Sequence, residues 1–130
     1  MKNFFKLLLA ILIVVGCEQP GVPQYSIETL MSNNRSSGGY FSKDGAKLLY
    51  SSDKSGIFNL YEIELNTYTE NQLTTSTEES FFARGYSPTT GEVIYSADSG
   101  GNENSHLYLI RNGKSLDLTP GEKTKASMLG

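Results

Sequence analysis

Cysteine and histidine are scarce in this chain of 130 residues, with one of each. A single cysteine cannot form an internal disulfide. The sequence also lacks a phosphate-binding loop, zinc-ligand spacing and a nucleotide-binding motif, so neither a cofactor nor a metal is expected. It carries 11 basic and 14 acidic residues, and no basic stripe with interleaved aromatics occurs. Nucleic-acid binding is therefore not expected.

The chain also lacks an apolar run long enough to span a bilayer. Its apolar segment Leu7–Val15 follows Lys2 and Lys6, the arrangement of a signal peptide rather than of a mature membrane helix. The run ends in Val14-Val15-Gly16-Cys17, which resembles a bacterial lipobox. We therefore predict that residues 1–16 are a lipoprotein signal peptide. Cys17 would then carry a lipid that holds the protein at a membrane of the cell envelope, facing the periplasm or the exterior. An ordinary signal peptide or short anchor with a chance cysteine is the alternative.

The segment after the predicted cleavage site has no apolar periodicity. Residues 17–24 contain Pro20, Gly21 and Pro23, which is typical of a flexible tether. One ordered region, residues 25–130, is expected to follow. Its start, Ser26–Met31, reads as a single helical turn capped by Ser26, with an edge strand as the alternative.

A repeat with a period of about 45 residues organises the rest of the chain. Ser51 and Ser96, Asp53 and Asp98, and Thr74 and Thr119 occupy matching places in the two copies. Short apolar strands at this period, separated by Asp/Gly turns, are typical of β-propeller blades. The predicted fold is all-β, an incomplete propeller of about two antiparallel four-stranded blades, with blade 1 near 36–74 and blade 2 near 81–119.

Eight strands are expected, four in each copy. They are Ser37–Ser42, Lys47–Ser52, Phe58–Leu65 and Tyr68–Thr74, and then Phe81–Ser87, Glu92–Ala97, His106–Arg111 and Lys114–Leu118. In the third strand Tyr61 and Ile63 alternate with Glu62 and Glu64, which predicts one packed face and one face in water.

The turns between these strands contain the residues that tight turns need. Asp44-Gly45, Thr90-Gly91 and Asn112-Gly113 place glycine where positive φ is required. Asp53 and Asp98 each precede a glycine by three residues. We expect both aspartates to form Asx turns rather than to act in catalysis or metal binding.

Two blades do not close a ring, because propellers usually have about four to eight. Residues 124–130 fall where the inner strand of a third blade would start. The sequence thus predicts the N-terminal part of a longer propeller. Without neighbours, its outer blade face and strand edges would favour aggregation.

Two families share this blade pattern. Phe41–Gly45, Tyr50–Asp53, Leu60-Tyr61 and Leu73-Thr74 resemble the periplasmic propeller repeat of the Tol system, whose consensus is close to FSPDG, FSSD, IY and LT. Such a match is generic for bacterial propellers. It implies a non-enzymatic module that binds proteins or glycans.

A second resemblance covers residues 25–130. Tyr25–Met31, Ser55–Asn59, Gly100–Tyr108 and Asp117–Ala126 are similar to the start of secreted prolyl oligopeptidase family serine peptidases of the dipeptidyl aminopeptidase/acylaminoacyl-peptidase type. The resemblance implies an N-terminal propeller that gates or binds peptide substrates for a missing C-terminal α/β-hydrolase domain. Blade 2 departs from blade 1 after Gly91, where it is one residue shorter.

The catalytic residues of that family cannot be carried over to this chain. Its nucleophilic serine lies in a G-x-S-x-G elbow, and the nearest strings here, Gly85–Thr89 and Gly113–Asp117, lack the second glycine. Ser87, Asp98 and His106 occur in Ser, Asp, His order only because Ser and Asp are abundant. We therefore assign no catalytic residue, and interpret His106 as a solvated or packed side chain.

Three further groups have structural interpretations. Glu78-Glu79 reads as a solvated turn between blades. Asn102-Glu103-Asn104 is rich in oxygen but has too few ligands for Ca²⁺. Arg84 lies in the first strand of blade 2 and could reach a central channel, although a partly buried structural role is favoured.

Three functions remain open. The first is the propeller portion of a lipid-anchored serine peptidase. The second is a non-enzymatic Tol-type lipoprotein that binds proteins. The third, and least favoured, is a two-bladed lipoprotein that completes its ring by oligomerising.

Overall fold

A computed structural model describes residue 21 and residues 24–128. Within residues 1–33, which form a separate unit, the described part contains the short helix α2 (Ile27–Met31). Ser26 caps it, and its hydroxyl accepts a hydrogen bond from the Thr29 backbone N–H. This confirms the helical turn in preference to the edge strand. Nowhere in the described residues is there a helix of the length and hydrophobicity needed to cross a bilayer.

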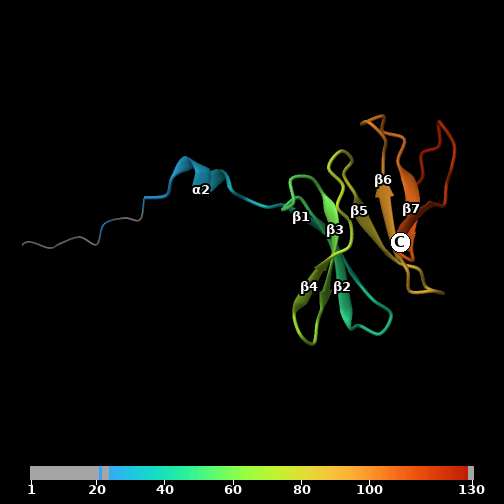
Figure 1. Ribbon diagram of the computed structural model, residues 1–130, viewed down its shortest axis with the longest axis horizontal. Coiled ribbons are helices and arrows are strands. Elements are labelled where there is room, and N and C mark those ends of the chain that lie inside the picture. Colours follow the sequence, from blue (N-terminus) through green and yellow to red (C-terminus); the bar gives the residue numbers. More distant parts are fainter. Residues whose placement is uncertain (1–20, 22–23, 129–130) are drawn as a thin grey trace, which may run out of the picture. The chain divides into compact units, whose positions relative to one another are not determined.

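Residues 34 onward form two antiparallel four-stranded sheets, which confirms the predicted all-β class (Figure 1). Blade 1 consists of β1 (Ser36–Phe41), β2 (Lys47–Ser52), β3 (Asn59–Glu64) and β4 (Thr69–Gln72). Blade 2 consists of β5 (Phe82–Tyr86), β6 (Val93–Ala97), β7 (His106–Arg111) and β8 (Lys114–Asp117). In both sheets the strands lie in chain order. All eight predicted strands exist: β2 and β7 have the predicted bounds, and the ends of the others differ by at most two residues.

The strands of the two sheets pair in the same register, so the two copies of the repeat match residue by residue. Tyr50 pairs with Tyr61 between β2 and β3, and Tyr95 pairs with Tyr108 between β6 and β7. The inner strands also match, because both β1 and β5 contain an irregularity before their last residues. Each residue of blade 1 on these strands therefore has one counterpart in blade 2.

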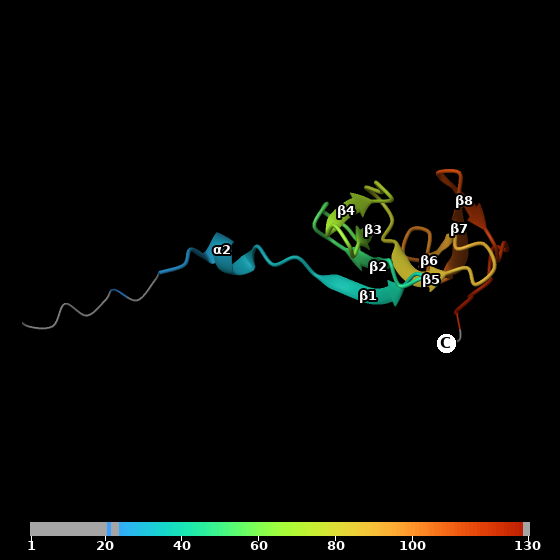
Figure 2. The same ribbon diagram turned by 90° about the horizontal axis from the view of Figure 1, so that it is seen from below.

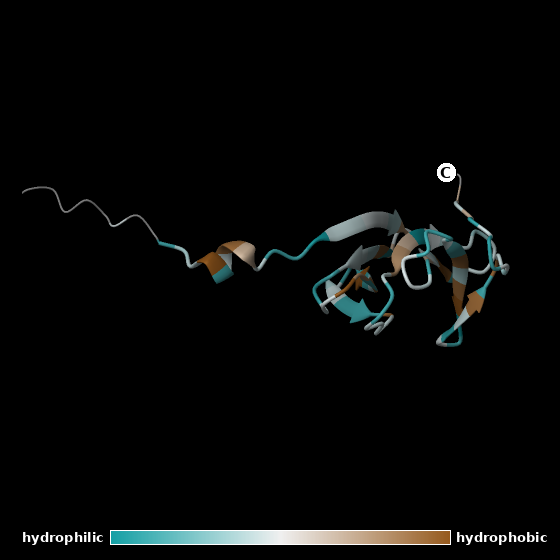
Figure 3. Cartoon of the chain, turned by 90° about the horizontal axis from the view of Figure 1, so that it is seen from above, coloured by the Kyte–Doolittle hydropathy of each residue, from teal (hydrophilic) through white to brown (hydrophobic). Residues whose placement is uncertain are grey.

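Hydrophobic side chains hold the two blades face to face. Leu49 and Leu60 of blade 1 are completely buried and pack with Val93, Tyr95 and other residues of blade 2. Figure 2 shows the two sheets next to each other, with the inner strands β1 and β5 in contact. Within this unit, Figure 3 shows hydrophobic colour on strands of both sheets. The core of this unit is thus an interface between blades, not the inside of one sheet.

Two hydrogen bonds cross between the blades at the start of β5. The Ala83 N–H donates to Ser51 Oγ at 2.7 Å, and both residues are buried. The Phe81 N–H donates to the Phe58 carbonyl at 2.8 Å. After blade 2 the same geometry recurs, because the Ala126 N–H donates to the Ser105 carbonyl at 2.8 Å. Residues near Ala126 therefore lie where the inner strand of a next blade would start.

Asp53 does not form the predicted Asx turn. Its carboxylate accepts hydrogen bonds from the Arg35 backbone N–H and from Arg35 Nε, both at 2.7 Å. The turn that follows is closed instead by the backbone, through Gly56 N–H and the Asp53 carbonyl. Asp53 thereby ties the β2–β3 loop to the segment that enters β1. These bonds, first from the Arg35 side chain and then from its backbone N–H, lower the pKa of Asp53.

The hydrogen bond between Ser51 and Ala83 should contribute measurably to stability. Ser51→Ala leaves a buried N–H without a partner, so we expect the free energy of unfolding to fall by about 1–3 kcal/mol. Urea denaturation followed by tyrosine fluorescence would measure this change.

Ser96→Ala is the matched control for that variant. Ser96 is the counterpart of Ser51, but its hydroxyl accepts a bond from Arg84, whose exposed guanidinium can turn to water. The control should lose less stability. Equal losses for both variants would show that the bond between blades is not the stabilising feature.

Candidate functional site

The residues singled out in the sequence do not come together. Cys17, the predicted lipidation site, lies outside the described residues. Ser87 follows β5 at one end of blade 2, whereas Asp98 and His106 lie at the other end, between β6 and the start of β7. The hydroxyl of Ser87 contacts Thr89 and the Thr90 N–H instead. No serine–histidine contact therefore exists among these three residues.

His106 is held between two hydrogen-bond acceptors. Its Nδ1 is 2.7 Å from Asp117 Oδ2, and its Nε2 is 3.0 Å from the Gly121 carbonyl. Burial would raise the pKa of Asp117, but bonds from His106 and from the Thr119 N–H outweigh it and lower that pKa. With both nitrogens engaged, His106 fastens the chain after β8 to blade 2, as the structural interpretation predicts.

The exposure predicted for Glu62 from the sequence pattern is wrong. Alternation along the third strand put it on the side of water, yet it is only 7% exposed and faces blade 2. Its Oε1 accepts a hydrogen bond from Lys47 Nζ, and its Oε2 accepts one from the Tyr86 hydroxyl, both at 2.8 Å. The apolar Leu109 at the matching place in blade 2 was the available signal that this position is buried.

The partners of Glu62 respond to its charge. Burial, and then the hydrogen bond to Glu62, raises the pKa of Tyr86 well above its ordinary value. Hydrogen bonds to Glu62 and Glu64 likewise raise the pKa of Lys47. Tyr86 therefore stays a neutral donor and Lys47 a cation at physiological pH, and the cluster joins the two blades.

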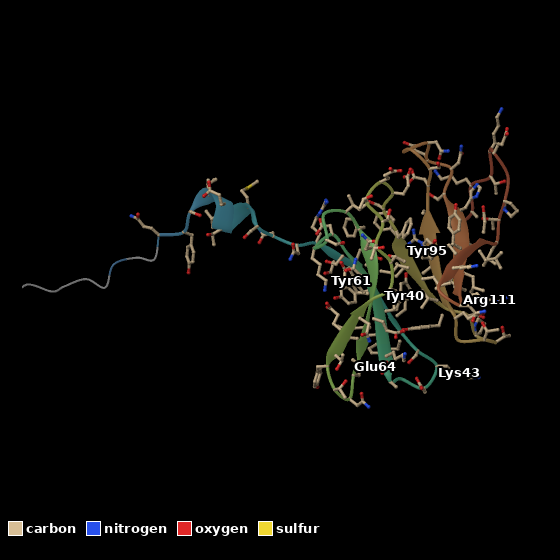
Figure 4. All side chains as sticks on the ribbon, in the orientation of Figure 1. Tyr40, Lys43, Tyr61, Glu64, Tyr95 and Arg111 are labelled. Carbon is tan, nitrogen blue, oxygen red and sulfur yellow. The ribbon has the colours of Figure 1, made fainter. Side chains whose placement is uncertain are left out.

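Two adjoining hollows open beside this cluster. One, of about 630 Å³, lies above Glu62 and is lined also by Ser42, Asp44 and Lys47. The other, of about 660 Å³, follows the ends of the inner strands. Lys43 and Tyr86 line both hollows, so the two adjoin at these residues. In Figure 4 Tyr40 lies near the junction of the blades and Lys43 lies on the turn after β1.

The second hollow combines aromatic and cationic side chains. Its lining includes Tyr40, Phe41, Lys43, Arg84 and Pro88. Phe41 is 65% exposed, and Arg84 uses Nε to donate to Ser96 Oγ at 2.9 Å. In residues 24–128 neither Lys43 nor Arg84 forms an ion pair. Apolar surface next to free cations suits a polypeptide that presents both apolar and acidic groups. We call these five residues the inner patch.

An ion pair lies at the matching position of each blade, and the acidic and basic residues are exchanged between the two blades. In blade 1 Lys47 Nζ lies 2.9 Å from Glu64, and their Cα atoms are in register. In blade 2 the matching residues are Glu92 and Arg111, which pair at 2.7 Å. Lys47 follows the β1–β2 turn that carries Lys43, and Glu92 follows Pro88 on the β5–β6 turn.

The remaining candidates are structural in the described chain. Glu79 accepts a bond from the Gly100 N–H at 2.6 Å, which links two loops, while Glu78 is exposed. Asn102 accepts a bond from the Asn104 N–H at 2.9 Å within its own turn. Within residues 24–128 no cluster of three His, Cys, Asp or Glu side chains has the arrangement to hold a metal ion.

Comparison with known proteins gives a structural relationship. The chain is similar to a solved structure described as the crystal structure of TolB from Acinetobacter baumannii. The TM-score is 0.56 at 25% sequence identity, over 66% of this chain and 21% of that chain. The present sequence therefore spans about a fifth of the protein that it resembles. No protein-family model and no curated protein matches the chain.

This likeness supports the generic resemblance to Tol-type propeller repeats. The fold is thus that of about two β-propeller blades, and its resemblance to Tol-type propellers is a generic one. The resemblance to prolyl oligopeptidase family peptidases finds no support in these comparisons, and it stays a prediction.

The Tyr86–Glu62 hydrogen bond offers a direct test of how the blades are joined. Tyr86→Phe removes the donor to a buried carboxylate, and we expect a loss of about 1.5–3 kcal/mol in the free energy of unfolding, the range for bonds to charged groups. Tyr40→Phe is the control, because the Tyr40 hydroxyl forms no hydrogen bond within residues 24–128. A loss no larger than that of the control would contradict the role of Glu62.

The Glu92–Arg111 pair should make stability depend on acid pH. Hydrogen bonds from Arg111 and then Thr90 lower the pKa of Glu92 from 4.5 to about 2. A carboxylate with a lowered folded-state pKa stabilises the fold above its unfolded pKa, and this contribution disappears as the pH falls through the folded value. The Tm deficit of Glu92→Gln should therefore be full at pH 6 and vanish near pH 2. Glu78→Gln, at an exposed carboxylate outside the pair, should show no such trend.

Proposed function

We propose that this chain is a Tol-type propeller module of the cell envelope that binds other proteins through the inner patch. The single observation that carries the proposal is the inner patch itself, on a fold similar to TolB. Lys43 and Arg84 lie next to Tyr40 and Phe41 at one end of the inner strands. The chain as a whole has a formal charge of −3, so this cationic and aromatic surface differs from its surroundings.

The chemistry of the patch indicates the kind of partner. The side chains of Lys43 and Arg84 donate hydrogen bonds only, so they select carboxylates or carbonyl oxygens. Phe41 and Tyr40 offer apolar area, which supplies binding energy when it is covered. A protein segment with alternating acidic and apolar side chains satisfies both requirements. The described residues supply no nucleophile and base in contact, so binding rather than hydrolysis is the function we assign to this portion.

The proposal includes attachment to a membrane. The predicted lipid on Cys17 would hold the module there through the tether of residues 17–24, with the blades from residue 36 onward free to meet a partner. Lipidation is supported by the lipobox-like sequence alone. Mass spectrometry of the protein from its native membrane would show a diacylglyceryl group on Cys17, and a chain cleaved elsewhere or unmodified would overturn this part.

Site-specific photocrosslinking in living cells tests the binding function. A photoreactive amino acid in place of Lys43 should give crosslinks to a partner protein. The same amino acid in place of Lys123, an exposed lysine close to Gly121, which contacts His106 at the opposite end of blade 2, should give few. Arg84→Glu should remove the crosslinks from position 43 while leaving the fold intact by circular dichroism. Equal crosslinking from both positions would refute the assignment of the inner patch.

Sequencing the DNA beyond codon 130 distinguishes the two candidate full-length proteins, a binding propeller and a serine peptidase. Further blades without a G-x-S-x-G elbow would support the binding module. Blades followed by such an elbow would favour the peptidase reading, in which the inner patch would face the active site.

A further inference from the structure

The segment that follows the last strand of a blade is bound to the third strand of that blade in the same way in both copies. In blade 1 the Leu60 N–H donates to Thr74 Oγ1 at 2.9 Å. In blade 2 the Leu107 N–H donates to Thr119 Oγ1 at 3.0 Å. The two outgoing segments therefore leave their blades on the same hydrogen-bonded framework.

One residue of this framework differs in its chemistry between the blades. In blade 1 the Asn59 amide nitrogen donates to the Ser76 carbonyl at 2.9 Å, and its oxygen accepts from the Ser76 N–H at 2.8 Å. The strand registers place His106 at the same position in blade 2, where its Nε2 is 3.0 Å from the Gly121 carbonyl. An amide offers a donor and an acceptor at every pH, whereas an imidazole changes its charge near neutral pH. A neutral amide thus holds the first outgoing segment, and a titratable ring holds the second.

Both ring nitrogens of His106 face groups that only accept hydrogen bonds. Nδ1 is 2.7 Å from Asp117 Oδ2. Burial raises the pKa of Asp117, but the bonds from His106 and the Thr119 N–H outweigh burial and lower it, so this carboxyl is ionised near neutral pH. The Gly121 carbonyl cannot donate at any pH. Only the doubly protonated ring can donate to both groups, because a neutral imidazole turns one lone pair toward an acceptor.

The surroundings of the ring provide no other cation to replace it as the donor. His106 lines a hollow of about 270 Å³ together with Glu122 of the outgoing segment and with Tyr108, whose ring centroid lies 6.3 Å away. Among the described residues that line this hollow, none is a lysine or an arginine. The neighbouring loops and the outgoing segment carry further titratable groups, namely Glu79, Asp98, Glu103, Lys123 and Lys125.

Gly121 is the partner that can move away when the ring is neutral. Asp117 belongs to β8 and is held in register with Tyr108 of β7. Gly121 is exposed in the outgoing segment, and its carbonyl also accepts the Thr124 N–H at 3.1 Å, which closes a turn over residues 121–124. A bond to an ionised acceptor is stronger than one to a neutral acceptor. The neutral ring therefore keeps its proton toward Asp117, and the turn separates from Nε2.

The turn leads directly to a side chain at the inner patch. Ala126 donates its N–H to the Ser105 carbonyl at 2.8 Å, and Met128 lines the same hollow as the inner patch. A Cβ placed on Gly85 would lie 4.0 Å from Met128 Cε and 3.7 Å from the Tyr40 ring. Met128 is 41% exposed, so it adds apolar surface beside Tyr40. The path of residues 121–128 thus sets one wall of that hollow.

We propose that His106 is a pH-dependent latch that positions Met128 at the inner patch. The protonated ring holds the turn over residues 121–124, Ala126 stays on Ser105, and Met128 contributes to the apolar surface that a partner covers. When the ring loses a proton, the Gly121 carbonyl is released and Met128 leaves the hollow. The inner patch therefore binds its partner more tightly when the ring is protonated. This consequence for binding rests on the proposed function, whereas the latch itself does not.

Hydrogen exchange of two matching amides, measured on the full chain in detergent micelles, tests the latch. The Ala126 N–H donates to the Ser105 carbonyl and the Phe81 N–H to the Phe58 carbonyl, both at 2.8 Å, so Phe81 is an internal control. Between about pH 5 and pH 8 histidine changes its charge. Over this range the protection factor of Ala126 should fall about tenfold relative to that of Phe81, because a charge-assisted bond is lost. A constant ratio would overturn the latch.

Two substitutions separate the effect of the proton from that of the side chain. His106→Asn installs the residue that blade 1 uses, so Ala126 should stay protected at both pH values. His106→Ala should leave Ala126 weakly protected at both. A pH dependence that persists in His106→Asn would show that another group is responsible and would overturn the assignment.

Methyl-labelled methionine reports the position of Met128 directly. In the wild type the nuclear Overhauser contact between the Met128 methyl group and Gly85 should weaken several-fold as the pH rises, and in His106→Asn it should stay constant. The Met31 methyl group, 75% exposed on α2, is the control and its signal should not change. A Met128 contact that is the same at both pH values in the wild type would contradict the positioning role of His106.

Photocrosslinking from position 43 in envelope membranes, repeated at both pH values, tests the consequence for binding. The yield in the wild type should fall several-fold as the pH rises, and the yield in His106→Asn should not. Crosslinks that do not respond to pH in the wild type would refute the coupling of the latch to the inner patch. An absence of crosslinks at either pH would instead refute the binding function, and the exchange and methyl measurements would still decide the latch.

Discussion

The structure depends on the contact between the flat faces of two small sheets. A four-stranded sheet has two faces and can bury neither of them alone, so each blade needs a neighbour. Here Leu49 and Leu60 fill the space against Tyr95, and the Ala83 N–H closes on Ser51. Everything else in residues 34–128 is arranged around this contact, including the hollows beside it and the faces that point away from it.

The two copies of the repeat share the positions that pack, but they differ in the charged residues at neighbouring positions. Lys47 and Glu64 form an ion pair in blade 1, and Glu92 and Arg111 form the reversed pair in blade 2. An exposed pair retains most of its small contribution when the signs are exchanged, because the attraction depends only on opposite charge. Glu62 is different, since a buried carboxylate needs its donors in place. Its counterpart is accordingly not another charge but Leu109.

Function in such a module depends on what the ends of the strands present. The inner strands bring Arg84 from one blade next to Lys43 and Phe41 from the other. Neither blade could form that surface alone, because the cations and aromatics come from both. The same geometry explains why one fold can support a binding platform or the gate of an enzyme: blade packing fixes the positions, and the residues at the strand ends set the chemistry.

The sequence alone determined the two copies, their eight strands and the helical turn at Ser26. These follow from local turn chemistry and from a repeat that can be read directly, as at Asn112-Gly113, where both residues have positive φ. The tertiary structure decided which charged groups are buried and which loops are tied together. Alternation placed Glu62 in water because a single strand cannot reveal that the side carrying Glu62 packs against the other blade. Asp53 was likewise assigned to its own turn, whereas its partner Arg35 is brought to it by the pairing of β1 with β2. Such contacts join residues far apart in the chain, and only the packing of one strand and one blade on another brings them together.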